Sequence, residues 1–330
     1  MQAGYRTLAI LKMLQKYSDE DHPMNAVEIA ERLREHDVEV ERRSIYRSIE
    51  ELEQHGVDIV HVEQKTQGFY LASREFELPE IKLLMDAVQA ARFIPGKKSR
   101  ELVNKLASFA SNAQAEALLK SVFIEDRAKC DNAQIYYNID KIYTAIRSQK
   151  QIGFQYCEYD LRKRRVARKG GAQYTASPYS LEWNNDAYYL ISRIGTLEKF
   201  THFRVDRMKD IKVLDDAAIG YKDLYGGNIN LSEYGTRALS MFEGPMEEVH
   251  LRFKNYLVTT VIDRLGAGIP IFPENDEWFS VHTPLVVSPG LTAWLAHFGG
   301  NAEVVAPAHA RAMVRDALGD MLSRYETDAL

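Results

Sequence analysis

The spacing of apolar residues changes part-way along this chain of 330 residues. Over most of residues 7–120, apolar side chains recur every three or four positions, which is the period of an amphipathic helix. After Gln149 they alternate with polar residues, which is the period of a half-buried strand. The pattern therefore predicts an α+β chain of several domains, with helices first and sheets later.

Composition excludes several classes of protein. Apolar residues make up 45% of the sequence and charged residues 27%, so each domain can bury a core, and a disordered or collagen-like chain is excluded. No apolar run approaches the roughly 20 residues needed to cross a bilayer. Met1 to Arg6 lacks the layout of a secretory signal, and Cys130 and Cys157 are too few for a disulfide framework. We therefore expect a cytoplasmic protein.

Three helical stretches open the chain. The first spans Thr7 to Tyr17. Asn25 followed by Glu28 has the spacing of a capping box, so a second helix should start at Ala26. A third runs from about Arg42 to His55, and its apolar residues share one face, which turns its basic and aromatic residues outward.

A β-hairpin follows these helices, with strands at Val57 to Val62 and Phe69 to Leu71. Three helices and a hairpin predict a winged helix-turn-helix over residues 1–74, whose third helix enters the major groove. The net charge of −4 over these residues leaves protein contact as the alternative role. The side chains that we predict to contact duplex DNA are Arg42, Arg43, Ser44, Tyr46 and Arg47 on the helix and Lys65 and Gln67 near the hairpin tip.

The runs SDEDHPMNAVEIAERL (18–33), VEVERRSIYRSIEELEQHGVDI (38–59) and GFYL (68–71) resemble the amino-terminal winged helix of bacterial WYL-domain transcriptional regulators. Two positions depart from the family's pattern. Glu41 stands where the recognition helix usually has Asp or Ser as its cap, and Ser48 where an Asp usually follows the Arg. Because Glu is a poorer N-cap, we expect a less stable helix start or a changed distance to the DNA backbone, with the module retained.

Residues 75–134 predict a helical connector. Helical spacing covers Leu78 to Phe93, Ser99 to Phe109 and Ala113 to Lys120. Nothing in this segment suggests chemistry. It is either a rigid bridge or dimer contact, or a plain linker.

Residues 135–214 carry a net charge of +7, although the whole chain has −5. This excess predicts an anionic partner, unless the basic run Arg162 to Lys169 is simply a solvated hairpin. After a helix near Asp140 to Gln149, short alternating strands separated by glycine and asparagine turns predict a small antiparallel barrel.

The last strand of this barrel, FTHFRVDR (200–207), should place its apolar side chains on one face and His202, Arg204 and Asp206 on the other. Arginines beside tyrosines fit an anion that carries rings, such as a nucleotide or a single-stranded nucleic acid. Phosphate would pair with Arg, and each base stacked on an aromatic ring contributes about 1–3 kcal/mol. The alternative is that Arg204 and Asp206 form a structural ion pair and the tyrosines fill the core.

The runs SPYSLEWNNDAYYLISR (177–193) and THFRVDRMKDIKVL (201–214) resemble the WYL domain, an Sm-like barrel that senses effectors. The residues that name the domain fall on Tyr188, Tyr189 and Leu190. Tyr188 replaces the Trp, which keeps an aromatic ring but loses the indole N–H. By this resemblance, the candidates for effector contact are Tyr179, Tyr189, Arg193, His202, Arg204 and Arg207.

Residues 215–330 hold a linker and a segment whose strands and helices alternate as β-α-β-β-α-β between Glu248 and Ala306, before a closing helix. This order predicts a ferredoxin-like α/β layer. The segment resembles the carboxy-terminal extension of WYL domains. The resemblance links it to dimerisation and to contact with the effector of the partner chain.

No P-loop, no strand-linked GxGxxG, no HExxH and no paired-cysteine zinc pattern occurs. We therefore expect no enzyme, cofactor or metal, with phosphoryl transfer or nuclease activity as the alternative. The sequence predicts a homodimeric, DNA-binding transcriptional regulator that responds to an anionic effector. The second hypothesis is a nucleic-acid-sensing accessory module that regulates another protein instead of a promoter.

Overall fold

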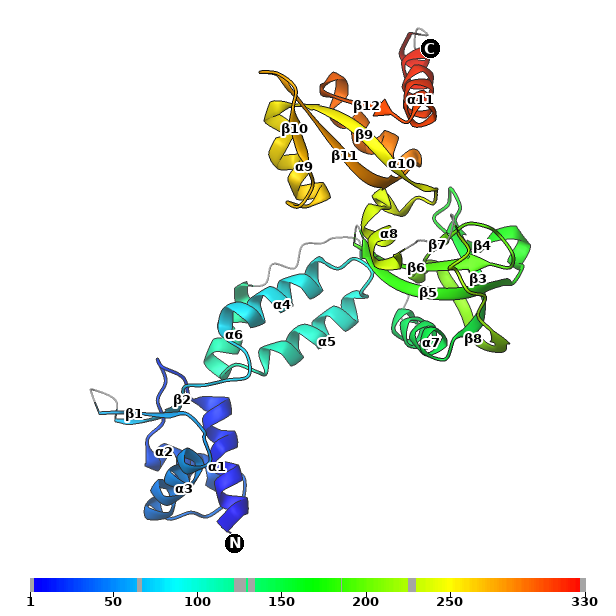
Figure 1. The fold of residues 1–330 in the computed structure, drawn as a ribbon. Coiled ribbons are helices and arrows are strands. Elements are labelled where there is room, and N and C mark those ends of the chain that lie inside the picture. The colour runs from blue at the N-terminus through cyan, green and yellow to red at the C-terminus, as the bar shows by residue number, and fades with distance from the viewer. Residues whose placement is uncertain are drawn as a thin grey trace. The chain divides into compact units, whose positions relative to one another are not determined.

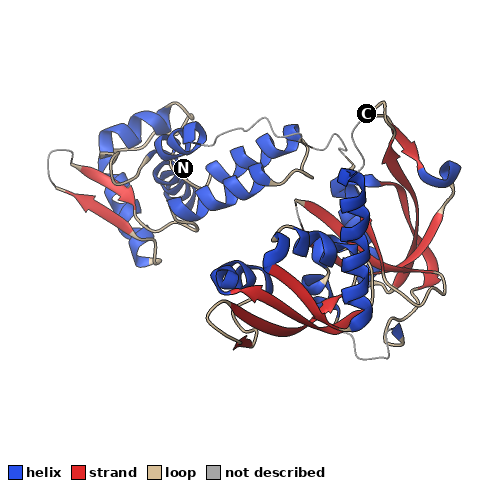
Figure 2. Ribbon diagram, turned by 90° about the horizontal axis from the view of Figure 1, so that it is seen from above, coloured by secondary structure: helices blue, strands red, loops and turns tan. Residues whose placement is uncertain are grey.

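The computed structural model describes residues 3–63, 67–121, 129, 134–184, 186–224 and 230–326. The chain divides into two compact units, residues 1–131 and 132–330, which are described separately. It is a mixed α/β protein with several domains and curled antiparallel sheets (Figure 1). Figure 2 shows that helices dominate the first unit and strands the second.

The first unit begins with three helices and a hairpin. They are α1 (Ala3–Tyr17), α2 (Ala26–Arg34), α3 (Arg42–Gln54), β1 (Ile59–Val62) and β2 (Gly68–Leu71). The predicted helix starts at Ala26 and Arg42 are confirmed. The Asn25 side chain accepts the backbone N–H of Glu28, whose carboxylate accepts the N–H of Asn25, so the predicted capping box is present. Ile29, Ile45 and other apolar residues of the three helices form one buried core.

A second helical group follows, with α4 (Leu78–Ala90), α5 (Gly96–Ala107) and α6 (Asn112–Ser121). Ile81, Met85 and Val103 are buried between these helices. The buried carboxylate of Asp19, just after α1, joins the two groups because it accepts a hydrogen bond from the Ser111 hydroxyl before α6.

Asp19 is held by several further donors. Its Oδ1 lies 2.7 Å from Nδ1 of His22 and accepts the backbone N–H groups of Asp21 and His22 at 3.1 and 2.9 Å. Burial by itself raises the pKa of the Asp19 carboxyl, but the hydrogen bonds from Ser111 and His22 outweigh burial and hold that pKa below its ordinary value. The ionised carboxylate therefore stabilises the folded first unit.

We expect Asp19→Asn to lower the free energy of unfolding by roughly 1–3 kcal/mol near neutral pH, because it weakens charge-assisted hydrogen bonds in a buried place. The folded pKa is lowered, so the contribution is present above the unfolded pKa of about 3.9 and is lost as pH falls through the folded value. Urea unfolding followed by circular dichroism should show the full deficit of the variant near pH 7 and a smaller deficit as the pH falls below the unfolded pKa and through the lowered folded pKa of Asp19. An equal deficit in the exposed control Asp21→Asn, or one that ignores pH, would contradict this assignment.

The second unit opens with α7 (Ile135–Arg147) and a six-stranded antiparallel sheet. Its strands are β3 (Lys150–Tyr159), β4 (Arg165–Ala167), β5 (Tyr174–Asn184), β6 (Ala187–Ile194), β7 (Thr201–Arg204) and β8 (Met208–Ala217). The order is β4-β3-β5-β6-β7, and β8 also pairs with β3, so the sheet curls on itself (Figure 1). Phe154, Tyr174 and Phe203 pack together inside, with Phe154 and Phe203 5.0 Å apart between ring centroids.

The predicted strand through Arg207 was wrong at its end. β7 stops at Arg204, and Val205–Arg207 form a 3-10 turn. The turn arises because β7 pairs with β6 whereas β8 pairs with β3, so the chain must change direction between them. Phe203 and Val205 are nevertheless both buried. The basic run Arg162 to Lys169 contains β4, which forms a hairpin with β3.

The remainder of the second unit contains a four-stranded antiparallel sheet in the order β10-β11-β9-β12. Its elements are α8 (Leu231–Arg237), β9 (Met246–Lys254), α9 (Val258–Leu265), β10 (Ile271–Pro273), β11 (Trp278–Val286), α10 (Pro289–Ala296), β12 (Ala302–Ala306) and α11 (Ala308–Glu326). Leu251, Phe253 and Val281 point to one face and pack with residues of α9, α10 and α11.

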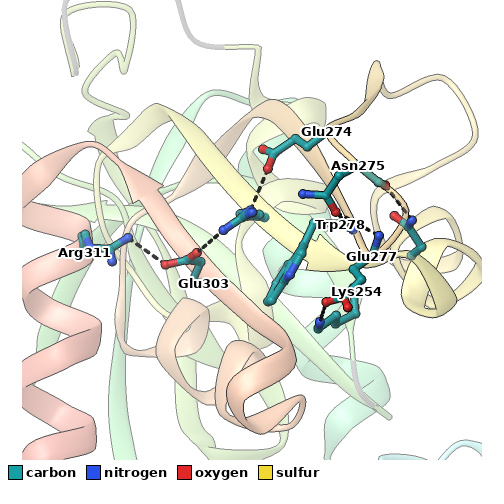
Figure 3. Close-up of polar contacts among 9 residues, drawn as sticks. Lys254, Glu274, Asn275, Glu277, Trp278, Glu303 and Arg311 are labelled. Atoms are coloured by element: carbon teal, nitrogen blue, oxygen red, sulfur yellow. Dashed lines mark hydrogen bonds and ion pairs between the residues drawn. The ribbon is translucent and has the colours of Figure 1, made fainter.

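The opposite face of this sheet is polar (Figure 3). Arg252 Nε donates to Glu274 at 2.7 Å and its Nη1 to Glu303 at 3.3 Å. The Arg252 guanidinium and Lys254 Nζ lie 4.6 and 4.5 Å from the centroid of the Trp278 ring. Lys254 also pairs with Glu277 at 2.5 Å. Cations and carboxylates on this face therefore largely compensate one another.

Candidate functional site

The outer face of α3 presents three arginines. Arg42, Arg43 and Arg47 are exposed, whereas Ile45 and Ile49 on the opposite face are buried. Glu41 occupies the N-cap position of α3, and its side chain makes no capping hydrogen bond. The Glu41 side chain therefore leaves the first turn uncapped beside a row of cations, which is an arrangement that suits a phosphate.

Tyr46 connects α3 to the hairpin. Its ring meets the Phe69 ring of β2 edge-on at 5.6 Å, and its hydroxyl accepts a hydrogen bond from Arg42 Nη2 at 3.3 Å. These contacts limit where the Arg42 guanidinium can lie. Ser44 is half-buried at the start of α3, and Gln67 is exposed directly before β2. Lys65 lies outside the described residues.

Two hollows border this face. The larger, of about 540 Å³, lies between the start of α2, α3 and the hairpin, and the smaller, of about 390 Å³, lies along α3 itself. Arginines line both, but so do glutamates: Glu28 and Glu63 in the larger and Glu41 and Glu50 in the smaller. The surface is therefore of mixed charge, with its cations concentrated on α3.

Ser48 has a packing role. It is fully buried, and its hydroxyl accepts a hydrogen bond from Arg6 Nε at 3.0 Å and lies 3.1 Å from the Thr7 hydroxyl oxygen. The Thr7 hydroxyl donates to Glu51 at 2.9 Å. These contacts fix α1 against α3, so Ser48 positions α3 and is not part of its exposed outer face.

Strand register gathers most of the predicted effector residues on one face of the curled sheet. Tyr189 of β6 lies opposite Arg204 of β7, and Ile191 lies opposite His202. Side chains of directly opposed residues share a face, and so do alternate residues of one strand. Tyr189, Arg193, His202 and Arg204 therefore belong to a single face. Residues 219–224 and 230–241, which follow the sheet, contribute neighbours on it.

Arg193 is already engaged on this face. It is only 6% exposed, and its Nη1 donates to the Gly220 carbonyl at 3.0 Å and to both carboxylate oxygens of Asp223 at 3.1 Å. The hydrogen bond from Arg193 holds the pKa of the Asp223 carboxyl below its ordinary value. Nε of Arg193 is buried and has no hydrogen-bond partner among the described residues.

Tyr179 of β5 contributes a neutral hydroxyl. It donates to the Ile219 carbonyl at 2.8 Å, and burial raises the pKa of its phenol to about 12. Its ring lies 4.9 Å from that of Tyr221. Tyr179 therefore packs against the segment that contains Ile219 and Tyr221.

Arg204 forms the ion pair that the sequence left open as an alternative. Its Nε and Nη2 donate to the two carboxylate oxygens of Asp206 at 3.1 and 2.8 Å. Arg165 Nη2 donates to the Asp206 carbonyl at 3.1 Å. The Arg204 side chain remains 33% exposed, so an anion could reach it and compete with Asp206. Arg207, in the following turn, is half-buried.

His202 is a half-buried imidazole on the same face. Its Nδ1 lies 2.7 Å from the Met241 carbonyl oxygen, and burial lowers the pKa of the imidazole. Nε2 is buried and has no hydrogen-bond partner among the described residues. A neutral ring that donates from Nδ1 would offer Nε2 as an acceptor. Asp223 and Met241 were not predicted, because they lie in an irregular segment with no strand period.

Comparison with known protein families gives two matches. Residues 137–213 match the WYL domain, and residues 245–322 match the WCX domain. The chain carries a WYL domain and a WCX domain. The curled sheet with its arginine face lies in the WYL domain, and the four-stranded sheet lies in the WCX domain. No curated protein matches the chain.

Two solved structures are similar over most of the chain at low identity. Proteasome accessory factor B/C (PafBC) of Arthrobacter aurescens is 14% identical with a TM-score of 0.28, over 98% of this chain and 49% of that one. A CRISPR Cas-related protein is 14% identical with a TM-score of 0.35, over 98% of this chain and 84% of that one. This chain therefore spans about half the length of the Arthrobacter protein.

No described helix is both long and apolar enough to cross a membrane. Within the same residues, no group of three or more His, Cys, Asp or Glu side chains could hold a metal ion.

Proposed function

We propose that this protein is a bacterial, cytoplasmic transcriptional regulator that binds an operator and responds to an anionic effector. Residues 1–74 act as a winged helix-turn-helix, residues 75–134 as a connector, residues 135–214 as an Sm-like WYL barrel and residues 215–330 as a linker with a ferredoxin-like extension. The observation that carries the proposal is the exposed row Arg42, Arg43 and Arg47 on α3, opposite that helix's buried face. The proposal assigns the protein no catalytic step.

The effector in this proposal is a nucleotide or a single-stranded nucleic acid. The face that holds Tyr189, Arg193, His202 and Arg204 supports it, since cations, aromatic rings and unpaired polar atoms gather there. Carboxylates already bind both arginines, so the effector must compete with Asp206 or use the remaining donors. A ligand that binds one state of the protein better than the other shifts operator binding only by that difference.

The glutamates around the α3 hollows favour a second candidate, an accessory module that senses nucleic acid and regulates another protein. Selection of bound genomic fragments by the purified full chain separates the two. Enrichment of one palindromic site supports the regulator, because a two-fold dimer reads two half-sites. Absence of any enriched site would overturn the regulator in favour of the accessory module.

We expect Arg204→Ala to abolish the effector response while operator binding is retained. The side chain is a partly exposed cation of the WYL domain, whereas the arginines of α3 lie in the other unit. Operator binding measured by anisotropy with a short single-stranded DNA should change about 5- to 150-fold in the wild type and not in the variant. Arg164→Ala, which removes an exposed arginine paired with Asp160 of its own hairpin, should respond like the wild type. If Arg204→Ala responds fully at the oligonucleotide concentration that suffices for the wild type, the effector binds at another place in the protein.

A further inference from the structure

The two arginines of the candidate effector face pair with carboxylates in opposite ways. The Arg204 side chain is 33% exposed and its partner Asp206 only 12%, so solvent reaches the cation. At the second pair the exposures are reversed, since the Arg193 side chain is 7% exposed and its partner Asp223 66%. An anion can therefore approach Arg204 directly. At Arg193 it meets the exposed carboxylate of Asp223 before the covered guanidinium.

The segment that carries Asp223 contacts the same face through uncharged groups as well. Ile219 is held at both of its backbone polar groups. Its N–H donates to the Ser177 hydroxyl at 2.8 Å, and its carbonyl accepts a hydrogen bond from the Tyr179 hydroxyl at 2.8 Å. The segment therefore reaches from β5 to β6, and we refer to residues 219–223 as the cover segment.

Residues further along the chain are packed more firmly on this face. Tyr234 of α8 is fully buried, and its ring centroid lies 4.7 Å from that of Phe200 and 5.6 Å from that of His202. α8 also lies against β5 (Figure 1), where a Cβ added at Gly235 would stand 2.9 Å from Cδ of Glu182. α8 is thus a fixed part of the structure. In the cover segment, by contrast, the ion pair has a carboxylate that is open to solvent, so this pair can exchange its anion.

We propose that Asp223 is an internal competitor of the effector and occupies the position on Arg193 that a phosphate of the bound nucleotide or single-stranded nucleic acid takes. The inference rests on the proposed function and deepens it, because it names the group that the effector displaces. A guanidinium binds carboxylates and phosphates with the same planar set of donors. Asp223 is therefore a chemical mimic of the phosphate that it excludes.

The exchange of one anion for the other leaves no buried charge unpaired. When a phosphate binds Arg193, the Asp223 side chain can turn into the solvent to which it is already exposed and be hydrated there. The buried guanidinium keeps an anionic partner, which it needs because an unpaired buried charge is costly. Asp206 is not exchanged in this way, because its side chain is largely covered. The free protein therefore holds the Arg193 position closed, and the apparent affinity for the effector falls with the fraction of molecules that are open.

Replacing Asp223 by asparagine tests the competition, because the amide has the shape of the carboxylate without its charge. The full chain with Asp223→Asn should bind a short single-stranded DNA about five- to thirtyfold more tightly than the wild type, since a larger fraction of molecules has Arg193 open. Asp223→Glu keeps the carboxylate and should stay within about threefold of the wild type. Fluorescence anisotropy measures the affinity, and circular dichroism verifies folding.

Asp216→Asn is the matched control, because it removes the same charge at another place in the domain. Asp216 is exposed on β8, which pairs with β3 and not with the strand that carries Arg193. This control should tighten oligonucleotide binding less than about twofold, through general charge effects. The gain from Asp223→Asn should fall to the same level in an Arg193→Gln background, where no guanidinium remains to be uncovered.

If Asp223→Asn binds the oligonucleotide no more tightly than Asp216→Asn, Asp223 only fastens its segment and the inference is overturned. A gain that persists in full in the Arg193→Gln background would overturn it as well, and the first comparison decides even where Arg193→Gln does not fold. Operator titrations with the same proteins test the proposed function separately. Equal oligonucleotide affinities alongside an intact operator response would remove only the competitor, whereas a tighter oligonucleotide complex that leaves operator binding unchanged would remove only the proposed function. An oligonucleotide that binds neither the wild type nor any variant would refute both.

Discussion

Replacing Arg43 and Arg47 together by alanine should weaken binding to the selected operator at least about thirtyfold and flatten its salt dependence. Each arginine that contacts a phosphate or a base edge contributes about 1–3 kcal/mol, and each phosphate contact adds roughly 0.9 to the slope of log K against log salt. Both side chains are exposed on α3, and the hollow along that helix is lined by both. The measurement is an anisotropy titration at several salt concentrations.

The matched control removes the same charge from α1. Lys12 and Lys16 are exposed there, so the double alanine variant should keep the wild-type slope to within general screening effects. If the Arg43 and Arg47 variant keeps an unchanged slope, or if both double variants lose affinity equally, α3 is not the DNA-contacting helix.

Gly290→Ala should destabilise the second unit by roughly 1–3 kcal/mol or more, which is the usual cost of overpacking. Gly290 lies in the first turn of α10, and a Cβ there would stand 2.2 Å from the Leu239 carbonyl oxygen and 3.2 Å from the Phe242 ring. Neither α10 nor the turn at Leu239 can move freely, because Leu239 and Leu291 both lie in the WCX core. The backbone itself must shift.

Thermal unfolding of this variant should show a transition at a lower temperature. Hydrogen exchange should show that the backbone amides around α10 lose protection. Gly319→Ala is the control, because a Cβ at Gly319 meets nothing within 4 Å and a helical glycine usually gains about 0.5–1 kcal/mol on replacement by alanine. The account of this contact fails if both glycine variants are equally stable.

Local signals predicted the helices of the first unit well. The Asn25 capping box and the apolar face of α3 depend on residues close together in sequence, and both are confirmed. The predicted end of β7 lies three residues beyond its actual end at Arg204. The turn after Arg204 arises because β7 and β8 pair with different strands, which local sequence does not reveal. The short strand β4 lies within the basic run Arg162 to Lys169 and was not predicted as a strand. The helix α8 was not predicted either.

The sequence predicted which residues belong to the candidate effector face, but not which partners they contact. Alternation placed His202 and Arg204 on one face, and register added Tyr189. The partner of Arg193 could not be inferred, because Asp223 is 30 residues away in an irregular segment. Pairing of Arg204 with Asp206 was one of two open alternatives, and the structure shows that pair while leaving the guanidinium partly accessible.

The central claim is that an oligonucleotide bound to the WYL face changes operator binding. The most direct test measures this coupling in both directions. Operator affinity is measured with and without saturating single-stranded DNA, and oligonucleotide affinity is measured with and without saturating operator, on the same full-length protein. If occupancy of the WYL face changes DNA binding, both ratios must be equal, and we expect a factor of about 5 to 150. An oligonucleotide that binds but leaves operator affinity unchanged would contradict the account.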